Sequence, residues 1–142
     1  MRDIYQYFDW FDGHVNNCGA ESFEFDYVPF GPEIGELFGV IYYFDGSRLE
    51  ITESVEFENR RPVKTHYVYQ YVSEGEPVFR YDNAPHHPDL PSYPHHKHVG
   101  RQRIAALEPS LKQVIEEVAG LLKDVPPAKP KRRRQSKRAG SK

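Results

Sequence analysis

A segment from Arg80 to His98 limits the folding of this chain more than any other part of its sequence. It reads R-Y-D-N-A-P-H-H-P-D-L-P-S-Y-P-H-H-K-H, with a proline at every third position from Pro85 to Pro94. Proline fixes the backbone angle φ and removes a hydrogen-bond donor, so neither a helix nor an interior strand is expected here. We predict a stiff, extended loop of polyproline-like character. Because this loop carries five of the seven histidines, it is a candidate functional site.

The residues before this loop carry the pattern of β-strands. Apolar and polar side chains alternate, or form short apolar runs, between turn signals. We expect strands at residues 22–30, 37–44, 48–57, 63–72 and 77–82. The pair Asp45-Gly46 is a strong signal of a two-residue hairpin, and a change of alternation around Ser54 indicates a bulge. Because the connections are short, the strands should form an antiparallel meander of about five strands.

Helical periodicity flanks these strands on both sides. Residues 3–16 place Ile4, Phe8 and Phe11 on one helical face, with Asp3 as the expected N-cap. After the loop, apolar residues recur at spacings of three and four from Leu111 to Leu122. Both helices should pack on the sheet, which makes the predicted fold class α+β.

The formal net charge of −2 conceals two electrically different regions. Eight basic residues and no acidic ones follow Pro126. The other 11 basic and 21 acidic residues leave the rest of the chain at −10. A segment so basic and poor in apolar residues cannot bury a core. We therefore expect a single domain over residues 1–125 and a disordered basic tail over residues 126–142.

Cysteine content and hydropathy exclude several classes of protein. With Cys18 as the only cysteine, the chain forms no intrachain disulfide and no cysteine-based zinc site. No apolar run approaches the roughly 20 residues that cross a bilayer, so we expect no membrane partner. The expected location is the cytoplasm.

The segments R-Y-D-N-A-P-H-H-P and Y-P-H-H-K-H resemble the TumE family, the toxin partners of bacterial and archaeal toxin-antitoxin pairs. The preceding meander, the Asp-Gly turn and the E-P-S before the last helix also fit this family. The resemblance covers roughly residues 1–123 and leaves out the basic tail. It implies growth inhibition by the unopposed protein and an antitoxin encoded beside it, usually a helix-turn-helix protein. It does not identify catalytic residues.

The side chains of the loop suit RNA cleavage without a metal, so an endoribonuclease is the first hypothesis. RNA supplies its own nucleophile, the 2′-hydroxyl, and the protein must supply an acid, a base and a cation for the phosphate. Histidine has the pKa that such proton transfer needs. The candidate catalytic residues are His86, His87, His95, His96 and His98 for proton transfer, Arg80 and Lys97 for the phosphate, Tyr81 and Tyr93 for stacking on bases, and Asp82 for orienting an imidazole.

Two other hypotheses fit the same loop. His86, His95 and His98 are candidate ligands of a divalent metal, with Asp82 and Asp89 as oxygen donors. Such a site suits a metal-dependent phosphodiesterase or nucleotide hydrolase. Alternatively, the loop is a rigid, non-catalytic surface that binds the antitoxin or another protein.

Three polar residues near these elements are assigned structural roles. We expect Asn83 to close an Asx-turn ahead of Pro85. His14 and His66 lie outside the loop and are treated as structural.

Overall fold

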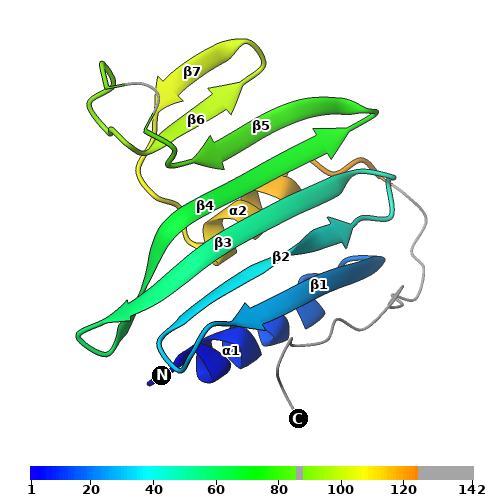
Figure 1. The fold of residues 1–142 in the computed structure, drawn as a ribbon. Helices are drawn as coiled ribbons and strands as arrows, with labels where there is room; N and C mark the ends of the chain where they lie inside the picture. Colours follow the sequence, from blue (N-terminus) through cyan, green and yellow to red (C-terminus); the bar gives the residue numbers. More distant parts are fainter. Residues whose placement is uncertain (86–87, 125–142) are drawn as a thin grey trace.

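The computed structural model describes residues 1–85 and 88–124, and these form an antiparallel sheet with two helices (Figure 1). The helices are α1 (Ile4–Asn16) and α2 (Leu111–Ala119), and the strands are β1 (Ser22–Pro29), β2 (Ile34–Tyr42), β3 (Arg48–Glu58), β4 (Arg61–Ser73), β5 (Glu76–Asp82), β6 (His96–Val99) and β7 (Gln102–Ala105). Within the described residues the sheet has seven strands, and their spatial order follows the sequence. The predicted α+β class and antiparallel meander are confirmed.

The predicted number of strands, about five, is too low. The predicted loop over residues 80–98 is also too long, because its last residues belong to a strand. The prolines occupy positions 85 to 94 only, so the backbone N–H groups of the residues after Pro94 remain available for pairing. Residues 96–99 form β6, which pairs with β5 on one side and with β7 on the other. An interior strand therefore runs through the last part of the segment.

The local signals of the other elements are borne out, except at the end of the last helix. Asp3 caps α1, because its carboxylate accepts from the backbone N–H of Gln6 at 3.0 Å. The predicted bulge appears as a register shift between Ser54 and Val55. The last helix ends at Ala119, before the predicted Leu121 and Leu122, because the glycine that follows has low helix propensity.

The core lies between one face of the sheet and both helices (Figure 1). Odd-numbered side chains of β1 to β3, of β4 from Tyr67 on, and of β5 point to this face, as the period of two requires, and they include the buried Tyr67, Tyr69 and Tyr71. The register shift beside Ser54 places the even-numbered Lys64 of β4 on this face as well. The helices contribute buried apolar side chains, namely Ile4, Tyr7, Phe8, Phe11 and Val15 from α1 and Leu111, Val114 and Val118 from α2. We call the opposite side of the sheet the open face.

The sequence also led to expectations about membrane-spanning segments and about the basic tail. No helix among residues 1–85 and 88–124 is long and apolar enough to cross a membrane. The predicted basic tail, residues 126–142, lies outside the described residues, so the division into a domain and a tail stays a prediction.

Candidate active site

The pairing of β5 with β6 brings four of the candidate residues together on the open face. Arg80 lies opposite His98, and Asp82 lies opposite His96. Since alternate side chains of a strand share a face, all four point to the side away from the helices. We call Arg80, Asp82, His96 and His98 the open-face cluster.

The inner half of the cluster is a buried carboxylate and imidazole. Asp82 and His96 are only 2% and 1% exposed, and His96 Nε2 lies 2.8 Å from Asp82 Oδ1. The other ring nitrogen, Nδ1, lies 3.0 Å from the carbonyl oxygen of Pro94. A carbonyl oxygen only accepts, so Nδ1 carries a hydrogen and the ring is held with Nε2 toward the carboxylate.

The outer half of the cluster reaches solvent. The side chains of Arg80 and His98 are 44% and 37% exposed. Arg80 Nε donates to Asp82 Oδ2 at 2.9 Å, and His98 Nε2 lies 3.9 Å from the same oxygen. The rings of His96 and His98 are 4.9 Å apart, edge to face. An exposed guanidinium and an exposed imidazole thus flank one buried carboxylate, an arrangement that can bind an anion and exchange a proton with it.

Tyr81 and Lys97, two other candidate residues, lie on the opposite face and contact α2. The Tyr81 hydroxyl donates to Glu117 Oε1 at 2.7 Å, and Lys97 Nζ donates to Glu117 Oε2 at 2.6 Å. Desolvation lowers the pKa of Lys97, but the hydrogen bonds with Glu117 and Tyr81 outweigh it and the pKa is raised. Burial and the bond to Glu117 raise the pKa of Tyr81. These residues attach α2 to the sheet and are not brought to the open-face cluster.

His95 lies one residue before β6 and turns toward the helix-covered side. Its Nδ1 is 2.9 Å from the hydroxyl oxygen of the buried Tyr67, and the two rings are stacked. His86 and His87, the remaining predicted proton-transfer residues, lie outside the described residues. Tyr93 is exposed, as base stacking requires.

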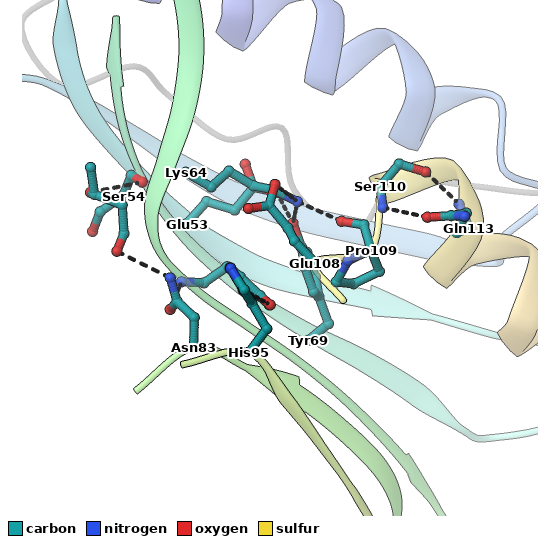
Figure 2. Close-up of polar contacts among 12 residues, drawn as sticks. Glu53, Ser54, Lys64, Tyr69, Asn83, His95, Glu108, Pro109, Ser110 and Gln113 are labelled. Carbon is teal, nitrogen blue, oxygen red and sulfur yellow. Dashed lines mark hydrogen bonds and ion pairs between the residues drawn. The ribbon is translucent and has the colours of Figure 1, made fainter. Parts of the chain in front are cut away.

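Asn83 does not close the predicted Asx-turn. Its Oδ1 accepts from the backbone N–H of Tyr67 at 3.0 Å, and its Nδ2 donates to the carbonyl of Thr65 (Figure 2). An Asx-turn from Asn83 needs an N–H two residues later, and Pro85 has none. Asp82 makes this contact instead, because its Oδ1 accepts from the backbone N–H of Ala84 at 3.0 Å.

The predicted metal ligands are only partly brought together. Among the described residues, the grouped donors are Asp82, His96 and His98, whose ligand atoms all lie within 4.8 Å of one another. The predicted oxygen donor Asp89 instead pairs with Arg103 at 2.9 Å. Two imidazoles and a carboxylate suit a transition metal such as Zn²⁺. The sequence signal for this grouping was the spacing of two between His96 and His98, which places both on one face of a strand.

A second buried polar group was missed by the sequence reasoning. Glu53 is fully buried on the helix-covered face, where it accepts hydrogen bonds from the hydroxyls of Tyr7 and Tyr69. Lys64 Nζ donates at 2.7 Å both to the Tyr69 hydroxyl oxygen and to the carbonyl of Pro109 (Figure 2). The signal was a glutamate at an apolar position of the alternating pattern, between Ile51 and Val55.

Burial controls the protonation of this second group. Desolvation raises the pKa of Glu53, although Lys64 and the two tyrosine hydroxyls act against it. Desolvation and the Glu53 charge likewise raise the pKa of Tyr7 and Tyr69. The contacts of Glu53 and Lys64 connect α1, β3 and β4 with Pro109, which immediately precedes the N-cap of α2. We therefore assign this buried polar group a structural role.

Comparison with known proteins places the chain in a family. A family model described as Toxin TumE matches residues 15–125, which include every residue of the open-face cluster. The same comparisons found no matching curated protein and no matching solved structure.

Proposed function

This chain belongs to the TumE toxin family and is the toxin component of a toxin-antitoxin module, and we propose that it inhibits growth by cleaving RNA at the open-face cluster. One observation carries the proposal. Arg80 and His98 lie opposite each other on β5 and β6, and both reach solvent beside the same oxygen of Asp82. A phosphate bound by Arg80 would therefore lie within reach of the His98 imidazole.

The chemistry needs no group beyond those of the protein, the RNA and water. His98 accepts the proton of the 2′-hydroxyl while that oxygen forms a bond to the neighbouring phosphorus. The bond from phosphorus to the 5′-oxygen breaks, and the departing oxygen takes up a proton from the solvent. Arg80 neutralises the charge that develops on the phosphate oxygens. The products are a 2′,3′-cyclic phosphate and a 5′-hydroxyl.

Asp82 and His96 act as positioning residues in this proposal. Their burial keeps water away, and the carboxylate holds Arg80 through a charge-assisted bond of 2.9 Å. The Pro94 carbonyl fixes the His96 ring, and that ring packs against His98. The exposed pair is thereby held in one arrangement before substrate binds.

A metal-dependent phosphodiesterase is the second candidate function, and the grouping of Asp82, His96 and His98 favours it. An ion there would supply an activated water, and hydrolysis would leave a 5′-phosphate in place of a cyclic phosphate. One contact counts against it. Asp82 Oδ2 already pairs with the Arg80 guanidinium, and a second cation beside that charge is disfavoured.

The partners follow from the family and from charge. Membership in a toxin family implies an antitoxin. We further propose that the antitoxin is a helix-turn-helix protein, that both act in the cytoplasm, and that the basic residues after Pro126 add nonspecific attraction for RNA.

End-group analysis of the cleaved RNA tests the proposal. The full-length protein is incubated with single-stranded RNA, with and without a chelator. We expect cleavage in both conditions with 2′,3′-cyclic phosphate ends. Chelator-sensitive cleavage with 5′-phosphate ends would favour the metal-dependent function. RNA that stays intact in both conditions rejects the nuclease. A toxic His98→Ala protein that no longer binds antitoxin would favour the non-catalytic surface.

A further inference from the structure

A shallow depression on the open face adjoins the proposed cleavage site. Its volume is about 370 Å³, and it extends from β2 across β3 and β4 to β5. A second depression of about 150 Å³ contains His98 and shares Gln70 and Arg80 with the first. The side chains that line the larger depression from the open face include Phe38, Val40, Glu50, Val68, Gln70 and Arg80.

The register explains this row of side chains. Val40 lies opposite Glu50, Glu50 opposite Gln70, and Gln70 opposite Arg80. Phe38, two residues before Val40 on the same face of β2, is 45% exposed. An exposed aromatic ring beside aliphatic side chains offers a stacking surface for an unpaired base.

Glu50 is the unexpected member of this row, because a carboxylate repels the phosphates of RNA. Its Oε2 accepts from Arg48 Nε at 2.8 Å, and its Oε1 accepts a long bond of 3.4 Å from the amide of Gln70. Each carboxylate oxygen can accept more than one hydrogen bond, so both retain acceptor capacity. The side chain is 38% exposed and faces the depression.

We propose that this depression binds a guanine base, so that the toxin prefers single-stranded RNA containing guanine. Guanine alone among the four RNA bases presents two adjacent donors, N1–H and N2–H, on its pairing edge, and these match the two oxygens of Glu50. The second amide hydrogen of Gln70 can reach O6, and Phe38 stacks on the ring. Arg48 holds the carboxylate in place.

The geometry connects this base site to the proposed chemistry. Glu50 on β3 and Arg80 on β5 are separated by two strand spacings, or roughly 10 Å. That span suits one nucleotide, with its base at Glu50 and an adjoining phosphate at Arg80. The inference rests on the proposed RNA cleavage, and it adds the substrate preference of the same site.

Binding by a variant that does not cleave tests the inference separately from catalysis. Full-length His98→Ala protein is titrated into labelled single-stranded oligoribonucleotides of A, C and U with one central guanine. Matched oligonucleotides carry inosine, which lacks N2–H, or adenine at that position. We expect the guanine oligonucleotide to bind about tenfold more tightly than the adenine one, with inosine between them.

Substitutions in the depression complete the test. Adding Glu50→Gln to His98→Ala should remove the guanine preference, and adding Phe38→Ala should weaken binding about tenfold for all three oligonucleotides. Glu56→Gln is the matched control, because Glu56 lies on the same strand outside the depression and should leave the preference unchanged.

Each outcome has a distinct meaning. Equal binding of the guanine and adenine oligonucleotides overturns the inference, and so does a preference that survives Glu50→Gln. Wild-type cleavage of RNA without guanine preference would leave the proposed function standing and remove only the guanine site. Guanine-selective binding by a protein that leaves RNA intact would support the guanine site and reject the proposed cleavage.

Discussion

Asp82 Oδ1 lies 2.8 Å from His96 Nε2 in a part of the open face where both side chains are almost fully buried. The two residues come from opposite ends of the proline segment, and the pairing of β5 with β6 makes them neighbours. The same carboxylate contacts Arg80 at its other oxygen. The buried Asp82 carboxylate therefore lies beside the two exposed side chains of the cluster, Arg80 and His98, which can act on a substrate.

Substitution of His98 tests the proposed base. We expect His98→Ala to lower RNA cleavage by about 100-fold to 10,000-fold, because positioned proton transfer contributes that much. Toxicity should fall with it, while the thermal unfolding midpoint should stay within a few degrees because the side chain is partly exposed. His66→Ala, at an exposed position on β4, should retain cleavage. Equal loss in both variants would contradict a specific role for His98.

The partition of the candidate residues between two faces makes a second prediction. Lys97→Met should lower the free energy of unfolding by about 1 kcal/mol, since the bond to Glu117 is lost, and leave cleavage within about twofold. Arg80→Met should reduce cleavage, and it should also lower the free energy of unfolding by about 1 to 3 kcal/mol because the buried Asp82 carboxylate loses a charge-assisted donor. Urea unfolding and initial cleavage rates measure both. If Lys97→Met abolishes cleavage in a folded protein, the assignment of the site to the open face is wrong.

Asp82 should matter for stability as well as for activity. We expect Asp82→Asn to lower the free energy of unfolding by about 2 to 4 kcal/mol, because a buried carboxylate that accepts from Arg80 and Ala84 is replaced by an uncharged amide. Asp89→Asn is the control, since its bond to Arg103 lies on the surface and should contribute nothing measurable. Equal unfolding midpoints for Asp82→Asn and the wild type would contradict the assigned contacts.

The buried Glu53 predicts a dependence of stability on pH. Its pKa is raised in the folded protein, so the folded state holds the proton more tightly than the unfolded state. This contribution is complete below the unfolded pKa near 4.3 and is lost as the pH rises through the folded pKa. We expect the free energy of unfolding, relative to Glu53→Gln, to fall above about pH 4.3 by at most about 1.4 kcal/mol per pH unit. Urea denaturation across pH 4 to 8 measures it, and a constant difference would contradict the raised pKa.

Removal of the basic residues after Asp124 tests their part in RNA binding. The protein truncated at Asp124 should keep its unfolding midpoint and its cleavage position, because every described element precedes this point. Its affinity for RNA should fall, and the salt dependence of binding should become shallower, since fewer cations are displaced from RNA. An unchanged salt dependence would remove these residues from substrate binding.

Local sequence signals predicted most of the framework. The alternation in Ser22–Pro29, the Asp3 cap and the apolar stripe of Leu111, Val114 and Val118 appear in the structure as predicted. Asp45-Gly46 lies in a hairpin connection, as predicted, but this connection between Tyr42 and Arg48 is longer than two residues. Each depends on residues that are close in sequence, where period, turn chemistry and capping act directly. The resemblance to the toxin family rested on the proline-histidine segment and is confirmed by the family match.

Histidine density by itself marked the segment, but the choice among its side chains needed long-range pairing. The sequence determined that imidazoles, a guanidinium and a carboxylate would lie near one another around a proline-rich turn. Only the tertiary structure decided that Arg80, Asp82, His96 and His98 share the open face while Tyr81 and Lys97 point to α2. The physical reason is that side chains alternate along a strand, so one pairing register assigns each residue to a face, and that register depends on contacts between segments far apart in the chain.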